Sequence, residues 1–345
     1  MKILLVNNMA PFVWGGAEEL VENLQKQLIL AGHQAEIMRI PFQWEPAERI
    51  PSQMLMVRSL ELYNVDRVIA FKFPAYLIRH SHKTLWLVHQ YRQAYDLYDA
   101  GQSNIPKNDE GNALRSCIFN ADNQNFSECR KIYTNSSVTR DRLLKYNNVN
   151  STVLLPPIND DKLFFNASCE DYIFAGGRIN RMKRQYMLIQ ALSYTKNNVK
   201  LLIAGPADTK NDECYILNLV HEFHLEDRVK IDIRFLPRQT YANYINHAVA
   251  VAYLPFDEDS LGYVSMEAAS AEKGLLTTSD SGGILQIVKH GSTGLVASPT
   301  PEDLAEALDT LWENRAQTKS FGHAAKELWN SFGVNWKNTL EALLQ

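Results

Sequence analysis

Short apolar runs alternate with amphipathic stretches from the first residues of the chain onward. Residues 1–7 form an apolar run that is typical of a buried parallel strand. A turn with glycines follows, and from Ala17 onward apolar residues recur with the period of an α-helix until Ala31 and Gly32 end it. Residues 34–40 have the pattern of a second strand. Strand, helix and strand in this order predict a βαβ unit with parallel strands.

The rest of the first half contains more strand-like runs and one polar gap. The apolar runs predict strands at 67–71, 84–88, 131–134 and 152–155. Residues 100–112 are polar and contain Gly and Pro, which favours a long loop. Residues 156–161, Pro-Pro-Ile-Asn-Asp-Asp, then join two stiff prolines to turn-forming side chains, so we expect the domain boundary there.

After this boundary the alternation of strands and helices starts again. Apolar runs predict strands at 172–175, 199–204, 229–233, 249–254 and 274–277. Helical patterns lie at 186–193, 215–223, 265–271 and 302–314, and the chain ends in a helical stretch with Trp336, Leu340 and Leu343. The pattern predicts an α/β protein with two halves that repeat strands and helices, 1–157 and 162–332. We also expect a final helix at about 333–345 that returns to the first domain.

Length and composition narrow the class of protein. A chain of 345 residues is long enough for about two domains. Lys and Arg number 35 against 39 Asp and Glu, and the resulting net charge of −4 argues against a nucleic-acid partner. No apolar stretch is long enough to span a membrane, and the run Ile3–Val6 is too short for the core of a signal peptide. We therefore expect a cytoplasmic protein.

The metal-binding residue types show no ligand spacing. The four cysteines, Cys117, Cys129, Cys169 and Cys214, form no C-x-x-C pair, so we expect reduced thiols rather than a zinc or redox site. The histidines form no H-E-x-x-H motif. His80 and His82 stand among basic residues, where a solvated basic edge is a better interpretation than a metal site. We therefore predict no metal and no cofactor.

Two candidates in the first half follow predicted strands. Gly15 and Gly16 come between the first strand and its helix, where small residues let a ligand approach the backbone and a helix N-terminus favours anions. The pattern is not G-x-G-x-x-G, so a tight strand–helix turn is an equal alternative. His89 ends the strand predicted at 84–88, although a lone histidine is more often a structural hydrogen-bonding group.

A cluster of cations follows the strand predicted at 172–175. Arg178, Arg181, Lys183 and Arg184 stand beside two glycines and ahead of a predicted helix. The carboxyl ends of parallel strands line the ligand crevice of such sheets, and Arg and Lys there suit a diphosphate. Like charges at a helix N-terminus oppose the helix dipole, so a bound anion explains them better than the alternative of a solvated helix start.

The most informative pattern is Asp259-x7-Glu267. Gly262 lies in a turn and a helix begins near Tyr263, so the backbone amides of residues 261–264 are placed to hold an anion. A carboxylate at Glu267, in the first turns of that helix, can accept two hydroxyl groups, as a ribose requires. A metal site or a solvated loop are the alternatives for the acidic triplet that ends at Asp259.

Taken together, the motifs resemble those of retaining glycosyltransferases with the GT-B fold, family 4. The resemblance covers nearly the whole chain and rests on the order and spacing of segments that are individually weak. These segments are 15–18 (Gly-Gly-Ala-Glu), 177–183 (Gly-Arg-x4-Lys), 202–206 (Leu-Ile-Ala-Gly-Pro), 259–267 (Asp-x7-Glu), 279–283 (Ser-Asp-Ser-Gly-Gly) and 291–296 (Gly-Ser-Thr-Gly-Leu-Val).

The resemblance implies two facing Rossmann-like domains, the first on the acceptor side and the second holding a nucleotide-sugar donor. Arg178 and Lys183 would then bind the donor diphosphate, and Glu267 the ribose. Asp259 stands where the family has a glutamate that contacts sugar hydroxyls, and His89 matches a histidine near the transferred sugar.

Backbone groups complete the implied site. The amides of Leu261, Gly262, Tyr263 and Val264 would touch the sugar and phosphate. Gly205 and, from the first domain, Gly15 and Gly16 would line the donor, with Gly16 closing over the phosphate. The segment 235–239 would border the base.

Three departures from the family pattern concern the donor sugar more than the fold. Asp259 replaces the usual glutamate and is one methylene shorter. Ser260 and Leu261 stand where the family has Gly-Phe. Arg184 follows Lys183 where the family usually has glycine.

These features predict a retaining, metal-independent glycosyltransferase that moves a sugar from a nucleoside-diphosphate sugar to a carbohydrate or lipid-linked acceptor, in cell-surface polysaccharide or glycoconjugate synthesis. Because no carboxylate is placed as a nucleophile, attack on the face that the diphosphate leaves fits the resemblance. A sugar-nucleotide epimerase or hydrolase and a non-catalytic nucleotide-sugar-binding scaffold are the alternatives.

The basic stretch 130–145 could make a peripheral contact at the inner membrane face, and the alternative is an ordinary solvated face. The base, acceptor and oligomeric state are not specified by the sequence.

Overall fold

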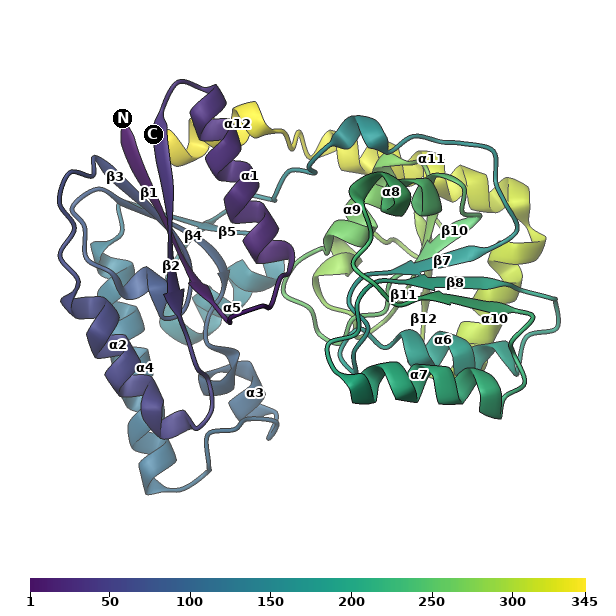
Figure 1. The fold of residues 1–345 in the computed structure, drawn as a ribbon, viewed down its shortest axis with the longest axis horizontal. Helices are drawn as coiled ribbons and strands as arrows, with labels where there is room; N and C mark the ends of the chain where they lie inside the picture. Colours follow the sequence, from purple (N-terminus) through teal and green to yellow (C-terminus); the bar gives the residue numbers. More distant parts are fainter. The chain divides into compact units, whose positions relative to one another are not determined.

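The computed structural model describes residues 1–345 and confirms an α/β protein with two Rossmann-like halves (Figure 1). The chain divides into two compact units. The first unit comprises Met1–Pro157 together with Val334–Gln345, and the second comprises Ile158–Gly333.

The first unit contains a six-stranded parallel sheet with the order β2-β1-β3-β4-β5-β6. Its strands are β1 (Lys2–Met9), β2 (Gln34–Pro41), β3 (Arg67–Lys72), β4 (Lys83–His89), β5 (Lys131–Thr134) and β6 (Thr152–Val153). Its helices are α1 (Gly16–Leu30), α2 (Ile50–Ser59), α3 (Asp96–Asp99), α4 (Asp109–Glu128), α5 (Ser137–Asn147) and α12 (Trp336–Leu344). Short 3₁₀ turns lie at Ala47–Arg49, Ala75–Leu77 and Arg92–Ala94.

Helices cover both faces of this sheet because successive strand residues point to opposite sides. Ile69 and Phe71 pack with α1 and α12 on one face, while Val68 and Ala70 pack with α2, α4 and α5 on the other. All four side chains are fully buried. This two-sided burial explains why β3 has a continuous apolar sequence and not an alternating one.

The C-terminal helix α12 belongs to the first unit and lies beside α1 (Figure 1). Leu343 is fully buried in the core that α1 forms with the sheet. The Tyr133 hydroxyl donates to the carbonyl of Ala342 at 2.9 Å, and the Arg67 guanidinium donates to the carbonyl of Leu343 at 2.8 Å. These two bonds satisfy carbonyl groups in the last turn of the helix, which have no partner within it.

The second unit repeats the plan, with the strand order β12-β11-β10-β7-β8-β9 in a six-stranded parallel sheet. The strands are β7 (Ile173–Gly176), β8 (Leu201–Ala204), β9 (Val229–Asp232), β10 (Ala250–Ala252), β11 (Gly274–Thr278) and β12 (Gly294–Ala297). The helices are α6 (Gln185–Leu192), α7 (Lys210–Glu222), α8 (Arg238–Asn246), α9 (Tyr263–Ser270), α10 (Pro301–Glu313) and α11 (Arg315–Ser331), with 3₁₀ turns at Asp161–Leu163 and Gly283–Gln286.

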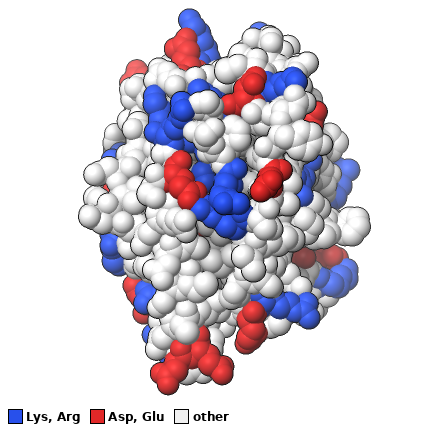
Figure 2. Space-filling view, turned by 90° about the vertical axis from the view of Figure 1, so that its left-hand side faces the viewer, with Lys and Arg blue, Asp and Glu red and all other residues white.

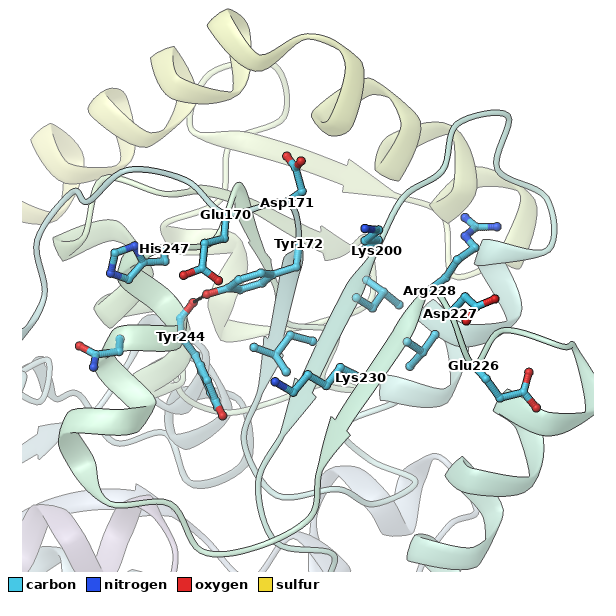
Figure 3. Close-up of a pocket in the computed structure, with 14 residues that line it drawn as sticks. Glu170, Asp171, Tyr172, Lys200, Glu226, Asp227, Arg228, Lys230, Tyr244 and His247 are labelled. Atoms are coloured by element: carbon cyan, nitrogen blue, oxygen red, sulfur yellow. Dashed lines mark hydrogen bonds between the residues drawn. The ribbon is translucent and has the colours of Figure 1, made fainter.

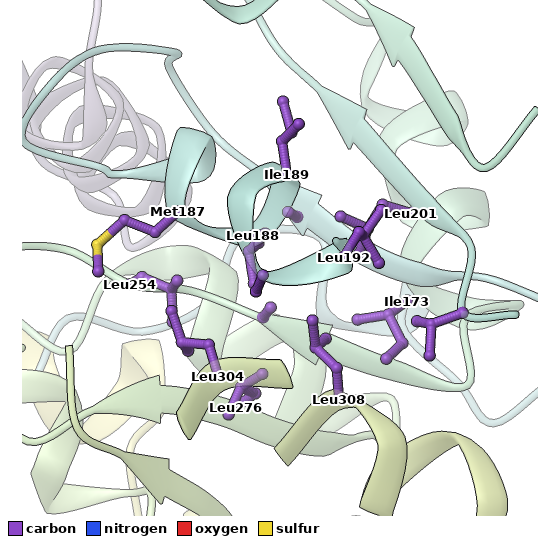
Figure 4. Close-up of a cluster of buried hydrophobic side chains, with 14 of the residues drawn as sticks. Ile173, Met187, Leu188, Ile189, Leu192, Leu201, Leu254, Leu276, Leu304 and Leu308 are labelled. Carbon is purple, nitrogen blue, oxygen red and sulfur yellow. The ribbon is translucent and has the colours of Figure 1, made fainter. Parts of the chain in front are cut away.

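The main core of this unit lies where α6, α7 and α10 pack on the sheet (Figure 4). Leu188 and Leu192 of α6 meet Leu304 and Leu308 of α10 over Ile173 of β7, and all are buried. The helices α8, α9 and α11 cover the other face, where Phe174 contacts Tyr241 and Tyr244. With both faces covered, the strand ends are the places where polar side chains and backbone groups can meet a ligand.

The structure corrects the expected loop at 100–112, because α4 already begins at Asp109. Asn108 caps it, since its side chain accepts a hydrogen bond from the amide of Gly111 at 2.8 Å. No helix combines the length and the apolar composition that crossing a bilayer would need.

Candidate active site

Most of the candidate residues from the second half of the sequence gather at the carboxyl ends of the strands of the second sheet. Gly177 follows β7 and Gly205 follows β8, and a Cβ atom on Gly205 would lie 2.1 Å from the carbonyl oxygen of Gly177. Gly205 also has φ +145°, a conformation that other residues rarely adopt. The two loops therefore touch through their backbones, which requires glycine and brings the cations after β7 to this edge of the sheet.

Lys183 is held by two side chains from the loop after β10. Its ammonium donates to the Tyr253 hydroxyl at 2.8 Å and forms an ion pair with Glu258 at 2.6 Å. Burial alone would lower the pKa of Lys183, but Tyr253 and Glu258 outweigh it and raise that pKa above its ordinary value. Lys183 is therefore a fixed positive charge at any physiological pH.

Arg178 lies on the same edge and is more exposed. Its guanidinium contacts both carboxylate oxygens of Asp208 at 3.1 and 3.2 Å, and Asn180 donates to the same carboxylate at 2.7 Å. The side chain of Arg178 keeps 39% of its surface exposed, so a solvent-borne anion can reach it. Burial raises the pKa of Tyr253, and the positive charge of Arg178 acts to lower it, but less than that of Lys183 does.

The other two cations of the cluster, Arg181 and Arg184, contact groups within the protein. The Arg181 guanidinium lies 3.6 Å from the ring centroid of Tyr215, a cation–π contact. Arg184 is buried and paired with Asp280 at 2.7 Å. Contacts within the protein thus explain two of the four positive charges in this segment. Arg178 and Lys183 also have protein partners, but they remain the candidates for binding a ligand at the strand ends.

The N-terminus of α9 meets this group of residues at Tyr253. Gly262 precedes α9 with φ +78°, and a Cβ atom there would lie 2.4 Å from the Tyr253 ring. Val264, in the first turn, lies against Gly177. Leu261 is fully buried, so this turn is fixed in place. The amides at the start of α9 and the ammonium of Lys183 therefore share one aromatic neighbour.

Asp259 is buried within the same turn. A Cβ atom on Gly283 would lie 2.4 Å from the carbonyl oxygen of Ser260 and 2.8 Å from that of Asp259. The amide of Gly283 donates to the carbonyl of Glu258 at 2.7 Å. The loop after β11 thus packs directly under residues 258–260 and determines their backbone path.

Glu267 is 1% exposed and forms an ion pair with Arg238 at 2.6 Å. Arg238, the first residue of α8, also donates to the carbonyl of Asn159 and stacks on the Phe164 ring at 4.8 Å. The carboxylate is therefore positioned by a guanidinium, an ion pair that the sequence did not indicate. A ribose at Glu267 would have to share the carboxylate with Arg238.

The candidates from the first half lie in the first unit, at the carboxyl edge of its own sheet. The amide of Gly15 donates to Glu18 at 3.0 Å, and the other oxygen of Glu18 accepts from Lys72 at 2.8 Å. The side chains of Glu18 and Lys72 are 12% and 13% exposed. The N-terminus of α1, which begins at Gly16, is thus capped by its own carboxylate, and Lys72 balances that charge.

His89 is the last residue of β4 and is paired in register with Lys72 of β3. Its Nδ1 lies 2.7 Å from the carbonyl oxygen of Gln90, a contact in which the imidazole donates. His89, Lys72 and the Gly15–Glu18 turn therefore occupy one sheet edge. The structure groups the candidates into two sets, one in each unit.

The sequence pointed to none of Tyr253, Asp208 and Lys72, and it included Arg238 only within the segment 235–239 that would border the base. Tyr253, Asp208, Arg238 and Lys72 each contact a candidate that is distant along the chain. The only signal in the sequence is the position of these residues: Lys72 ends β3, Tyr253 directly follows β10, and Asp208 follows the turn after β8. Such a position marks the edge of the sheet but not the partner.

The basic stretch 130–145 is largely engaged with neighbours in the structure. Arg140 pairs with Asp141 at 2.8 Å, Arg142 with Asp96 at 3.6 Å, and Lys145 donates to the Tyr146 hydroxyl. On the face drawn in Figure 2, basic and acidic side chains lie next to one another. This mixed distribution gives no extended area of positive charge on that face.

A hollow of about 560 Å³ opens elsewhere in the second unit (Figure 3). It is lined by the residues before and at the start of β7, β8 and β9, among them Tyr172, Lys200 and Lys230, and by Tyr244 of α8. In a parallel sheet these amino ends lie at the edge opposite to Lys183. The hollow is therefore separate from the candidate site.

Comparison with known proteins places this geometry in a family context. Residues 160–328, within the second unit, match the family described as Glycosyl transferases group 1. N-acetyl-alpha-D-glucosaminyl L-malate synthase of Bacillus anthracis is 27% identical over 150 residues, which are 43% of this chain and 37% of that protein. The chain thus covers less than half the length of the curated relatives that it matches.

Solved structures resemble the whole chain. Sucrose-phosphate synthase from Thermosynechococcus elongatus has a TM-score of 0.77 at 17% identity, covering 99% of this chain and 96% of that one. HepE of Anabaena, in complex with UDP and glucose, has a TM-score of 0.72 at 16% identity, covering 100% and 99%. At such identities the likeness shows the fold. The second unit therefore matches the glycosyl transferases group 1 family, and the chain as a whole has the GT-B fold of two Rossmann-like domains.

Proposed function

We propose that this protein is a glycosyltransferase that moves a sugar from a nucleoside-diphosphate sugar to an acceptor hydroxyl. The observation that carries the proposal is the arrangement at the carboxyl edge of the second sheet. There Lys183 and the amino end of α9 share Tyr253 as a neighbour, and Arg178 lies in the same loop after β7 as Lys183. Two cations and a helix N-terminus at one sheet edge suit a diphosphate, and this unit is the one that matches the family.

The chemical task is to stabilise the charge that develops on the departing diphosphate. Arg178 and Lys183 supply two positive charges for it, and we propose that they do so without a metal ion. Asp259 would contact hydroxyl groups of the sugar and Glu267 those of the ribose, with Arg238 holding Glu267 in place. His89 and the Gly15–Gly16 turn would contribute from the first unit. The expected result is a family 4 enzyme that retains the anomeric configuration.

The nature of the donor and acceptor is a further part of the proposal. HepE has been solved with UDP-glucose, with UDP and glucose, and with UDP, which supports a UDP-sugar as the first donor to test. We propose a carbohydrate or lipid-linked acceptor and a role in cell-surface polysaccharide or glycoconjugate synthesis. The enzyme would act in the cytoplasm or at the inner membrane face. Liposome flotation tests the membrane contact directly.

Binding is tested first, by the rise of the melting temperature with UDP, GDP, ADP and dTDP and their sugars, because a ligand of the folded state stabilises it. Transfer is then measured with radiolabelled donor and an acceptor panel, with and without EDTA. The Lys183→Ala variant should lose turnover by about 10²-fold or more, as expected for the loss of a group that stabilises developing charge.

Lys210→Ala is the matched control, since Lys210 lies on the surface of α7 and pairs only with Glu213. Its turnover should equal that of the wild type. Near wild-type turnover in Lys183→Ala would refute the donor-site assignment. Release of free sugar without acceptor would indicate a hydrolase, and binding without turnover a scaffold.

A further inference from the structure

Arg184, the residue next to Lys183, has a conformation that favours glycine. Its φ is +56°, in the left-handed region, and it immediately precedes α6. This conformation is sterically unfavourable for any residue that has a Cβ atom. Such a residue keeps it only where contacts with the surrounding structure offset the strain. The side chain of Arg184 is 7% exposed, so it does not compensate by reaching solvent.

The compensation is a set of hydrogen bonds to the ends of two neighbouring strands. Nε donates to the carbonyl of Leu254 at 2.8 Å, and one terminal nitrogen donates to the carbonyl of Pro255 at 3.0 Å, both in the segment after β10. The guanidinium also donates to both carboxylate oxygens of Asp280, at 2.7 and 2.8 Å, and to the Thr278 hydroxyl at 2.7 Å. Burial alone would raise the pKa of Asp280, but the bonds from Arg184 and Thr278 outweigh it and lower that pKa.

These bonds tie together the segments that carry the partners of Lys183. Leu254 directly follows Tyr253, which contacts Lys183 and packs against Gly262 at the start of α9. The same segments are joined by their backbones, since the amide of Asp257 donates to the carbonyl of Asp280 at 2.8 Å. Arg184 therefore holds the segment that carries Tyr253 and Glu258, the two partners of Lys183.

We infer that Arg184 is a positioning residue for the diphosphate of the donor: it fixes Lys183 and the amino end of α9 relative to each other and does not touch the donor itself. The inference rests on the proposed function, because it assigns a task to Arg184 within that site. Glycine at this position would avoid the conformational cost but would lose the fork that joins the loops after β10 and β11. Arginine therefore strains the backbone at this position but holds the two loops in a fixed geometry.

The test compares UDP binding with stability in matched variants. Calorimetric titration with UDP and with UMP, and the melting temperature, are measured for the wild type, Arg184→Gly, Arg184→Lys and Asp280→Asn. Arg184→Gly should weaken UDP binding by about tenfold and UMP binding clearly less, because the two cations and the α9 amides serve the diphosphate. Arg184→Lys, which keeps the charge without the fork, should lie between the wild type and Arg184→Gly.

Arg228 offers the matched control. It is a second internal arginine fork in the same unit, bonded to the carbonyls of Val199 and Leu192 and to Thr195 near the amino ends of the strands. Arg228→Lys should lower the melting temperature as Arg184→Lys does, yet leave UDP affinity within about twofold of the wild type.

The possible results distinguish a failure of the positioning role of Arg184 from a failure of the proposed function. Wild-type protein that binds UDP while Arg184→Gly binds it equally well overturns the positioning role and leaves the proposed function standing. UDP affinity that falls in proportion to the melting temperature in both the Arg184 and the Arg228 variants also overturns it, since this indicates a general loss of folded protein. A wild-type protein that binds none of UDP, GDP, ADP and dTDP overturns the proposed function, and the positioning role with it.

Discussion

At the scale of single residues, Gly262 shows how two requirements can fall on one position. It has φ +78°, and a Cβ atom would lie 2.4 Å from the ring of the buried Tyr253. Gly262→Ala should therefore lower the free energy of unfolding by about 2–4 kcal/mol, because it strains the backbone and also displaces the ring. Denaturant unfolding measures this loss, and UDP titration should show weaker binding because Lys183 shares the same ring.

Gly291 is the matched control for this prediction. It has a similar φ of +71°, and a Cβ atom there would meet nothing within 4 Å. Gly291→Ala should therefore cost only the backbone part, about 1 kcal/mol. Equal losses in the two variants would show that contact with Tyr253 contributes nothing.

Asp122 gives the first unit a pH-dependent stability. Its carboxylate is fully buried and accepts from the hydroxyls of Tyr76 at 2.9 Å and Tyr95 at 2.7 Å. Burial raises the pKa of Asp122 from 3.8 to about 7, against the opposing effect of the two hydrogen bonds. The folded state thus holds a proton that the unfolded state releases between these values, so stability should fall by a few kcal/mol as the pH rises from about 4 to 7.

The Asp122→Asn variant tests this linkage, because the amide cannot titrate. Urea midpoints from pH 4.5 to 7.5 should decline less in the variant than in the wild type. Asp141→Asn is the control, since Asp141 is an exposed carboxylate paired with Arg140, and its midpoints should follow the wild type. Identical slopes in the wild type and Asp122→Asn would refute the raised pKa.

The cations after β7 show which parts of the site could be predicted from single residues. Lys183 and Arg178 could be named as candidates because residue type, neighbouring glycines and a following helix are local features. Their partners Tyr253, Glu258 and Asp208 could not, since each lies on another strand end, 30 to 75 residues away along the chain. The sequence also could not show that Arg184 has a positive φ or that it pairs with Asp280, because both depend on the folded loops.

At the scale of elements, strands were easier to predict than helices. The runs at 67–71 and 131–134 match β3 and β5 closely, because a strand buried on both faces has a continuous apolar sequence. The helix α4 was not predicted at all, and its first residues were expected to lie in a loop. Few of its residues are apolar and buried, and polar Asp122 and Asn125 also face its core. A helix that buries polar groups has no clear apolar stripe for a sequence pattern to reveal.

The helix α12 should stabilise the first unit although it comes last in the sequence. Leu343 is fully buried against the sheet, so Leu343→Ala should lower the free energy of unfolding of this unit by about 3 kcal/mol. Urea unfolding followed by tryptophan fluorescence measures the change, since Trp86 lies in the same core. The control is Glu341→Ala on the exposed side of α12, which should change stability by less than about 0.5 kcal/mol. An unchanged midpoint for Leu343→Ala would mean that α12 does not stabilise this core.

At the scale of the whole molecule, the repetition of strands and helices was enough to predict two α/β halves, and the resemblance to a family added their Rossmann-like fold. Each half restarts with a short apolar run followed by a glycine turn, which is a local signal. The contacts that fasten the last residues to β3 and β5, through Arg67 and Tyr133, join positions more than 200 residues apart. Such contacts depend on the assembled sheet, so periodicity can suggest them but cannot specify them.

Because the two units have separate cores, calorimetry should resolve two unfolding transitions. UDP at about 100 times its Kd stabilises the unit that binds it by about 2.7 kcal/mol. In a unit of this size that corresponds to a rise of roughly 5–10 °C in the melting temperature. We expect the melting temperature of the second unit to rise, because Arg178, Lys183 and the start of α9 all belong to it.

The Leu343→Ala variant identifies the transition of the first unit, since it should lower only the melting temperature of that unit. If UDP raised only the transition that Leu343→Ala lowers, the nucleotide would bind at the Gly15–His89 edge, and the assignment of the donor to the second unit would be wrong.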